Sequence, residues 1–292
     1  MSTAFVLTGG GSLGVVQVGM LAALHEHGVE PDLLVGTSAG ALNAAFLAGA
    51  DSTSHRIDAL ADLWQQVRRR DVFATRPRRW LAATVGAVPS LFDDSHLRAL
   101  TSTHLGYEQL EDARLPVHVV ATDLVTGRGE ALTRGCAVDA VLASAAVPGL
   151  LPPVQHAGRT LVDGGVGEFD ALRHADAHGV DDIYLLPAGY PCAGPSPVTA
   201  LGITLTALSL LLHRQLQAQV RDYRGSARLH VMPPLCPLAV SPADFVHAAG
   251  LLRRSRRVSS QWLARGEDAV GPEHVLALHD HFAPGSAAPR SA

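Results

Sequence analysis

Short, almost wholly apolar runs alternate along this chain with longer segments in which apolar residues recur at helical spacing. A strand that is apolar at every position is typical of a parallel sheet covered on both faces, because neither side of the strand meets water. The pattern therefore predicts an α/β fold, a three-layer α/β/α sandwich with a mostly parallel central sheet. The expected strands are residues 4–8, 33–35, 117–122, 160–162, 183–187 and 228–232, and the expected helices are residues 13–27, 39–47, 55–69, 138–145, 200–223 and 242–263.

No linker-like segment divides the chain, so we expect one domain over residues 1–282. The last ten residues, 283–292, are rich in Ala, Pro, Gly and Ser and predict a flexible tail. Between two apolar runs, Thr126-Gly127-Arg128-Gly129 has the composition of a tight turn and predicts a hairpin.

Composition narrows the classes of function. The net charge of -4 argues against general nucleic-acid binding, and three widely spaced cysteines without a C-x-x-C argue against a disulfide framework or a Cys-rich zinc site. The amino terminus carries no positive segment before its first apolar run, and the run at residues 200–212 is too short to span a membrane. We therefore expect a cytoplasmic protein.

The first expected strand is followed by a glycine loop, Gly9-Gly10-Gly11-Ser12-Leu13-Gly14. Its spacing fits the dinucleotide-binding G-x-G-x-x-G, but that fold also needs an acidic residue at the end of the second strand, and Asp32 stands before that strand. Glycines can instead turn successive backbone N–H groups into a cleft and form an oxyanion hole. A tight turn without any chemistry remains the other interpretation.

The second expected strand leads into Gly36-Thr37-Ser38-Ala39-Gly40, a G-x-S-x-G between a strand and an Ala-rich helix. This context is typical of a nucleophile elbow, in which a sharp turn presents the serine hydroxyl above a helix amino terminus. The simpler alternative is that Ser38 only caps the helix.

A nucleophilic serine needs a base, and Asp163 ends a short strand in Leu161-Val162-Asp163-Gly164-Gly165. Its carboxylate is expected to project from the same sheet edge as Ser38, although an Asp at a strand end is often only a turn former. Only one strand and one helix precede Ser38, which does not suit an ordinary α/β-hydrolase.

These three motifs, in this order, resemble those of the patatin-like phospholipases. The resemblance extends to Ala121-Thr122-Asp123 and to the segment from Ala143 to Pro148, and it covers about residues 4–186. It implies a lipid acyl-ester hydrolase without a cofactor, in which Ser38 is the nucleophile and Asp163 the base. The backbone of Gly9, Gly10, Gly11 and Ser12 would form the oxyanion hole, and Gly36, Gly40, Gly164 and Gly165 would support the turns.

Two positions depart from the family pattern. Leu13 stands where many relatives have Arg or Lys, and Gly167-Glu168-Phe169-Asp170 stands where relatives tend to have Asn and Pro. A catalytically impaired protein that binds lipid or a protein partner is therefore a second hypothesis, and a dinucleotide-binding oxidoreductase is a third.

Two further patterns were considered for binding. His174 and His178 are four residues apart on an expected helix, but no third ligand accompanies them in the sequence, so we expect no metal site. The segment from Arg68 to Trp80 is rich in Arg and carries two aromatic residues, which suits either peripheral contact with an anionic membrane or a solvated helix end.

Overall fold

The structure is a computed structural model, and it describes all residues except 50, 74–75, 194–195, 266–274, 278–280 and 282–292. The tail expected at residues 283–292 lies outside the described residues, as does the last residue of the expected domain. Within the described part of the chain, no helix is both long enough and apolar enough to cross a membrane.

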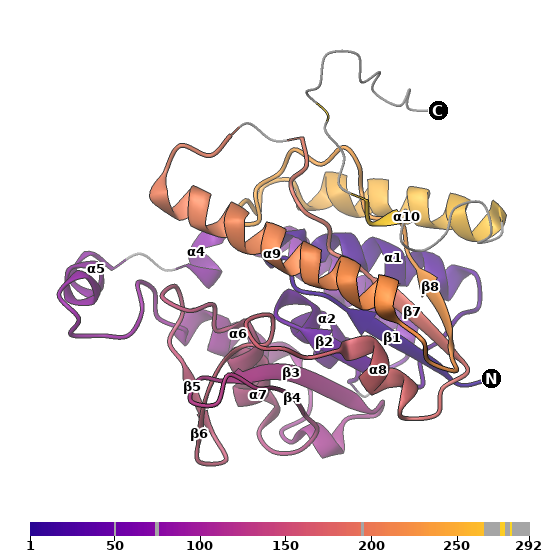
Figure 1. Ribbon diagram of the computed structural model, residues 1–292, viewed down its shortest axis with the longest axis horizontal. Coiled ribbons are helices and arrows are strands. Elements are labelled where there is room, and N and C mark those ends of the chain that lie inside the picture. The colour runs from indigo at the N-terminus through magenta and orange to yellow at the C-terminus, as the bar shows by residue number, and fades with distance from the viewer. Residues whose placement is uncertain (50, 74–75, 194–195, 266–274, 278–280, 282–292) are drawn as a thin grey trace.

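One twisted sheet of eight strands forms the middle of the molecule (Figure 1). The strands follow the order β5-β6-β3-β2-β1-β7-β8, and β4 pairs with β3 beside this path. The five strands β1, β2, β3, β7 and β8 run parallel, while β4, β5 and β6 are antiparallel to their neighbours. The mostly parallel sheet predicted from the sequence is thus confirmed. The strands are β1 (Thr3–Leu7), β2 (Leu33–Thr37), β3 (Val117–Asp123), β4 (Gly129–Leu132), β5 (Val154–His156), β6 (Arg159–Asp163), β7 (Asp182–Leu186) and β8 (Arg228–Val231).

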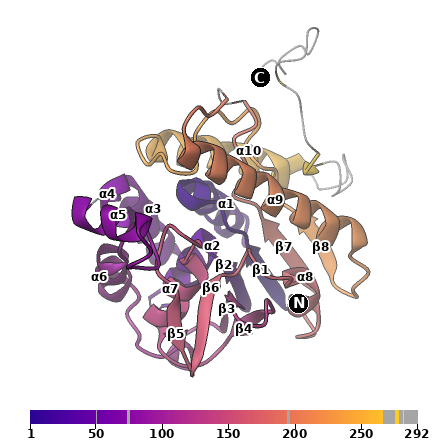
Figure 2. The same ribbon diagram turned by 60° about the vertical axis from the view of Figure 1, so that its left-hand side comes forward.

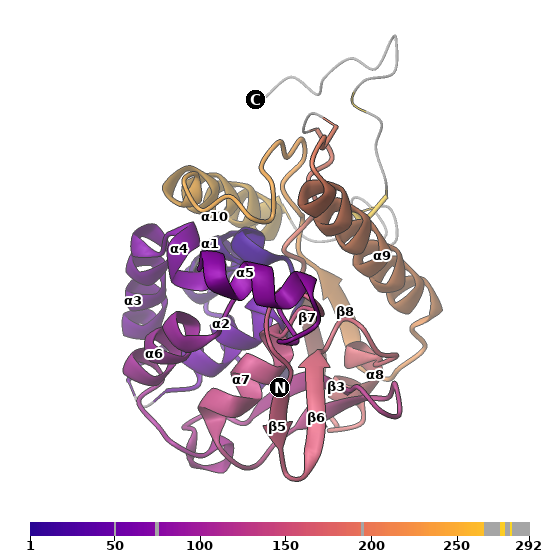
Figure 3. The ribbon, with the colours of Figure 1, turned by 90° about the vertical axis from the view of Figure 1, so that its left-hand side faces the viewer.

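Helices cover both faces of this sheet, which confirms the three-layer sandwich (Figures 2 and 3). Phe5 and Leu7 point to the layer that contains α1, α2, α7 and α10, whereas Ala4 and Val6 point to the layer of α8 and α9. Successive side chains of a strand face opposite ways, so a strand that is buried on both faces must be apolar throughout. The helices are α1 (Val15–Glu26), α2 (Ala39–Leu47), α3 (Thr53–Gln66), α4 (Arg69–Val72), α5 (Pro77–Thr84), α6 (Ser95–His104), α7 (Ala137–Ala145), α8 (Ala171–Asp176), α9 (Ala200–Asp222) and α10 (Ala248–Arg265), with short 3-10 turns η1 (Gly11–Gly14) and η2 (Leu110–Asp112).

One expected helix was placed wrongly at its start. The helix predicted from residue 242 begins at Ala248, because the preceding residues form turns. The Asp244 carboxylate accepts a hydrogen bond from the backbone N–H of Val246 at 2.9 Å, a local bond that competes with helix formation. The expected hairpin is confirmed by the antiparallel pairing of β3 with β4.

Candidate active site

Strand register brings Ser38 and Asp163 to the same level of the sheet. Thr37 pairs with Val120, and the next residue of β3, Ala121, pairs with Asp163. Ser38 directly follows Thr37, so Ser38, Ala121 and Asp163 lie in one row across β2, β3 and β6. Asp163 is the last residue of β6, which runs antiparallel to β3. Its place in the row therefore follows from the register of β6 with β3, and not from a strand direction shared with β2.

Ser38 stands at a sharp turn between β2 and α2. Its backbone has φ 54° and ψ -121°, a conformation that L residues rarely adopt and that the surrounding structure must hold in place. The flanking glycines are required by space: a Cβ on Gly36 would lie 2.6 Å from the Cα of Ala41, and one on Gly40 would lie 2.3 Å from the carbonyl oxygen of Leu7. These contacts fit the elbow geometry expected from G-x-S-x-G.

Ser144, on α7, holds this turn in place through two hydrogen bonds. Its hydroxyl accepts a hydrogen bond of 2.8 Å from the backbone N–H of Ser38 and donates one of 2.5 Å to the carbonyl of Val120. Ser144 is fully buried, so the hydroxyl satisfies two backbone groups that water cannot reach. The sequence had drawn attention to the segment around Ser144 without revealing this contact, which joins residues 106 positions apart.

The loop that carries Asp163 is fixed through its own backbone. Thr122 Oγ1 donates to the Asp163 carbonyl and accepts from the Gly167 N–H, each at 2.9 Å. The Gly165 N–H donates to Asp163 Oδ1 at 2.9 Å, and a Cβ on Gly164 would lie 2.2 Å from the Val120 carbonyl oxygen. The two glycines after Asp163 thus let the chain turn closely against β3 and supply one donor to the carboxylate.

Burial governs the charge of Asp163, whose exposed fraction is 4%. Desolvation raises the pKa of this carboxyl to about 6, while hydrogen bonds from the Ser38 hydroxyl and the Gly165 N–H act in the opposite direction. The carboxylate is thus ionised at neutral pH, is a stronger base than an exposed Asp, and lies within hydrogen-bonding reach of the Ser38 hydroxyl.

The glycine loop lies next to Ser38. A Cβ on Gly9 would lie 3.1 Å from the Ser38 Cβ, and one on Gly10 would lie 2.4 Å from the Cβ of Ala188. Gly11 has φ +57°, and a Cβ there would lie 2.5 Å from the Pro242 carbonyl oxygen. Side chains are thus excluded from the loop by close neighbours on three sides.

Ser12 differs from the three glycines before it. Its backbone N–H donates to the Pro242 carbonyl at 2.8 Å, and its hydroxyl donates to the Ser241 carbonyl at 3.1 Å. Among the described residues, no acceptor is paired with the N–H groups of Gly9, Gly10 and Gly11. In this conformation the three glycines, and not Ser12, have backbone donors free for a ligand.

A cleft with an empty volume of about 850 Å³, part of it open to solvent, adjoins the row of Ser38 and Asp163. It lies on the α9 side of the sheet, and its lining includes Gly9 and Gly10 of the glycine loop, Gly164 and Gly165, and Thr37 next to Ser38. Much of its wall is apolar, with side chains of Val120, Phe169, Ala171, Pro187, Leu212 and Leu216.

One histidine, His213 on α9, lines this cleft and was not anticipated from the sequence. Its Nε2 donates to the Leu276 carbonyl at 2.8 Å, and burial lowers the pKa of its ring. Burial favours the neutral imidazole, whereas the hydrogen bond to the Leu276 carbonyl acts in the opposite direction and ties His213 to the chain beyond α10. The two departures from the family pattern take different places: Leu13 is fully buried in the core, whereas Phe169 contributes to the cleft wall.

Two groups of side chains outside this cleft have the spacing of metal ligands. One consists of His118, His174 and His178, and the other of Cys192, Cys236 and His281. Burial, with the neighbouring imidazoles, lowers the pKa of His118 to about 4, and the pKa of His174 is lowered by the same causes. The sequence indicated only the His174–His178 pair, because His118 comes from a strand 56 residues earlier.

The fold and the site together define an α/β protein with a serine at a strained strand-to-helix turn, a buried aspartate beside it and a glycine loop alongside. Residues 5–176 match the family model of the patatin-like phospholipases, and the chain belongs to this family.

Comparison with curated proteins gives relatives of moderate identity. A lysophospholipase nte1 of Aspergillus terreus is 32% identical over 192 residues, which are 64% of this chain and 12% of that protein. An uncharacterized NTE family protein of Mycobacterium tuberculosis is 30% identical over 178 residues, 61% of this chain and 46% of that one. The chain thus spans about an eighth of the length of the fungal relatives it matches. Among solved structures, VipD from Legionella pneumophila aligns over 94% of this chain and 66% of its own, with a TM-score of 0.46 and 14% identity.

Proposed function

We propose that this protein hydrolyses acyl esters of phospholipids or related lipids, with Ser38 as nucleophile and Asp163 as base. The observation that carries the proposal is the pairing of a strained serine with a buried carboxylate in one row of the sheet, beside a glycine loop with free backbone donors. Membership of the patatin-like phospholipase family supports the lipid class of the substrate.

In the first step, the Ser38 Oγ attacks the ester carbonyl carbon while its proton moves to the Asp163 carboxylate. The carbonyl electrons pass to the carbonyl oxygen, and backbone N–H groups of Gly9, Gly10 and Gly11 stabilise that charge. The amino terminus of α2, which begins directly after Ser38, favours negative charge at the same place.

The tetrahedral intermediate then collapses, the alcohol leaves with the proton from Asp163, and Ser38 carries the acyl group. In the second step Asp163 removes a proton from water, the resulting hydroxide attacks the acyl-enzyme, and the fatty acid is released. The proton returns to the Ser38 oxygen, so the enzyme ends in its starting state.

The apolar wall of the cleft supports an acyl chain as the bound part of the substrate. Phe169 lines it together with Leu212 and Leu216 of α9, and the glycine loop lines the same cleft, so an ester at the loop can place its chain along α9. Apolar binding of this kind scales with the area removed from water.

The proposal is tested by measuring fatty-acid release from phospholipids and lysophospholipids in a panel of variants. Ser38→Ala and Asp163→Asn are expected to lower turnover at least about a thousandfold, because both groups act in the same step. His213→Ala, the matched change of the one cleft histidine among the described residues, is expected to retain turnover within about threefold, because its Nε2 is occupied by a carbonyl.

Circular dichroism confirms that each variant is folded. Full activity of Ser38→Ala would refute the nucleophile. A silent but folded His213→Ala would replace the dyad by a triad, and an inert wild type on every lipid ester would favour a lipid-binding protein without catalysis.

A second proposal concerns access to the substrate, which lies in membranes. The exposed side chains of Arg78, Trp80, Leu81 and Val85 gather on and just after α5, which stands away from the body of the molecule (Figure 1). Exposed aromatic and aliphatic groups beside arginines are typical of peripheral contact with anionic lipid. We propose that α5 rests on the membrane surface.

A further inference from the structure

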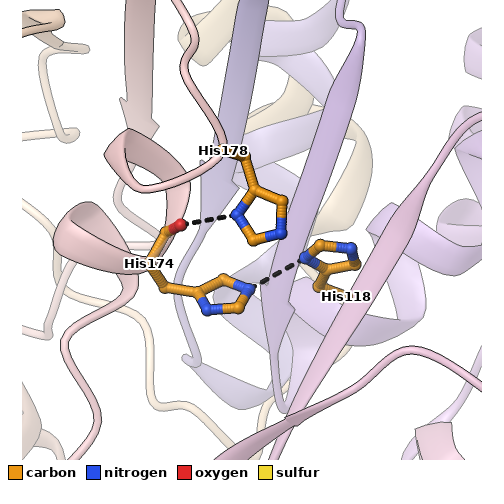
Figure 4. Close-up of side chains that lie close together, drawn as sticks. All are labelled: His118, His174 and His178. Carbon is orange, nitrogen blue, oxygen red and sulfur yellow. Dashed lines mark hydrogen bonds between the residues drawn. The ribbon is translucent and has the colours of Figure 1, made fainter.

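Three imidazoles meet at the end of β3 that lies away from the catalytic row (Figure 4). His118 is the second residue of β3, His174 lies on α8, and His178 follows one turn later. His178 lies in the turn that follows α8, and the rings of His174 and His178 both contact the ring of His118. The ring centre of His118 lies 5.0 Å from that of His174 and 4.7 Å from that of His178.

The nitrogens of these rings have a spacing close to that of metal ligands. His118 Nδ1 and His174 Nε2 are 2.8 Å apart, and one nitrogen from each of the three rings lies within 4.8 Å of the other two. Four ligands around Zn²⁺ at about 2.0–2.1 Å require neighbouring nitrogens about 3.3 Å apart. The 2.8 Å contact is a hydrogen bond, so an ion would displace the proton that it holds to water or to the other nitrogen of the same ring, and rotation of the rings would then bring the three nitrogens to that distance.

One ring is already oriented for metal binding. His178 Nδ1 lies 2.8 Å from the carbonyl oxygen of His174, and a carbonyl only accepts, so Nδ1 carries a proton. The nitrogen left for a metal is Nε2, which faces the other two rings (Figure 4). A second ring nitrogen bonded to a backbone carbonyl is the usual arrangement of metal-bound histidine.

The surroundings of the cluster lack the usual partner of a charged histidine. Among the described residues, no carboxylate is paired with any of the three rings. His118 is buried, with 8% exposure, whereas His178 is exposed, so an ion between the rings is held by protein on one side and reached by water on the other. Water can then supply a fourth ligand.

We propose that His118, His174 and His178 bind a divalent transition-metal ion such as Zn²⁺. Neutral imidazoles suit Zn²⁺, Cu²⁺ and Ni²⁺ and do not suit Ca²⁺ or Mg²⁺, which prefer oxygen ligands.

The position of the cluster assigns the ion a structural role. His118 precedes Ala121, the β3 residue in the catalytic row, by three positions, which is about 10 Å along a strand. The ion therefore does not touch the reacting ester group. It joins α8 to β3, and α8 follows the loop of Asp163 in the chain, so the ion fastens the segment that holds the base.

The test is a titration of the chelator-treated protein, residues 1–292, with ZnCl₂, followed by calorimetry and by thermal unfolding. The other candidate group is removed first by the double change Cys192→Ser, Cys236→Ser. In this background we expect one bound Zn²⁺ per chain and a rise in Tm that grows with zinc concentration. His178→Ala, which changes an exposed residue, is expected to weaken binding more than about 100-fold and to abolish the rise in Tm, since even an outer-sphere partner is worth 10- to 100-fold.

His55→Ala, which removes an exposed histidine of α3, is the matched control and is expected to bind zinc as before. Unchanged binding in His178→Ala, or no binding in the double Cys variant, would overturn the proposal. If the double variant does not fold, the zinc stoichiometry is compared between the wild type and His178→Ala with both cysteines present. The proposal then predicts that His178→Ala binds one Zn²⁺ fewer per chain. Turnover of lipid ester after chelation reports separately on Ser38 and Asp163.

Discussion

The Asp163 carboxylate lies in a site that disfavours its charged form, and that environment links catalysis to pH. The base acts only when it is ionised, so kcat/KM for an acyl ester should follow the ionised fraction of Asp163. With its pKa raised to about 6 by burial, the expected rise is about tenfold between pH 5 and pH 7, followed by a plateau. A steady-state pH profile measures it, and a midpoint near pH 4 would contradict the buried base.

The same carboxylate makes stability depend on pH. Below about pH 3 it is protonated in both the folded and the unfolded chain. As pH rises toward 6, the unfolded chain ionises first, so folding loses stability over this range and the loss persists above it. Asp163→Asn removes the charge, and it is expected to raise the free energy of unfolding by up to about 3 kcal/mol at pH 8 but by less than about 1 kcal/mol at pH 4. Urea unfolding at the two pH values measures the difference, and equal effects at both would refute the linkage.

At the residue level, the sequence reveals functional residues that can be recognised from their immediate neighbours in the chain. Ser38 and Asp163 stand out because glycines flank them. Glycine is needed at those positions because a Cβ would lie too close to Ala41, Leu7 or Val120. Contacts between distant segments carry no such signal. The hydrogen bond of Ser144 with Ser38 and the approach of His118 to His174 depend on strand order, which local patterns do not encode.

At the level of elements, the glycine loop depends on its fit against the segment before α10. Gly11 and Gly28 both have positive φ, +57° and +74°, but a Cβ on Gly11 meets the Pro242 carbonyl whereas one on Gly28 meets nothing within 4 Å. Gly11→Ala should displace the loop and lower turnover on the order of a hundredfold, the scale of one lost oxyanion donor.

Gly28→Ala is the matched control for backbone strain alone. It is expected to cost about 1 kcal/mol of stability and to leave turnover unchanged. Equal turnover in the two variants, measured on folded protein with one ester, would argue against main-chain donors in the loop.

The pattern of apolar residues was sufficient for the elements that form the core. β1, β2 and α1 are buried on every side or on a broad face, so their sequences are apolar over most of their length. Elements at the margin were missed: α6 has polar residues through most of its length, and β5 contains three residues. The start of α10 was predicted too early because the Asp244 side chain forms a hydrogen bond that favours a turn.

At the scale of the whole molecule, the projecting α5 leads to a prediction on lipid binding. Trp80 and Leu81 are 57% and 65% exposed, so their burial in a lipid surface removes apolar area from water. The double variant Trp80→Ala, Leu81→Ala is expected to bind vesicles with anionic headgroups at least about tenfold more weakly than the wild type.

The matched control is Val125→Ala on the β3–β4 turn, a site 85% exposed. Co-sedimentation measures the bound fraction, and turnover of a soluble short-chain ester should stay unchanged in both variants. Equal vesicle binding by all three proteins would exclude α5 as the contact surface.

Covalent labelling of Ser38 tests the central claim most directly. A fluorophosphonate reacts with a serine only where a base removes its proton and an oxyanion site receives the phosphoryl oxygen. We expect one adduct per chain, located on Ser38 by peptide mass spectrometry, absent from Ser38→Ala and formed at least about a hundredfold more slowly in Asp163→Asn. A folded wild type that stays unlabelled, or an adduct on another serine that persists in Ser38→Ala, would contradict it.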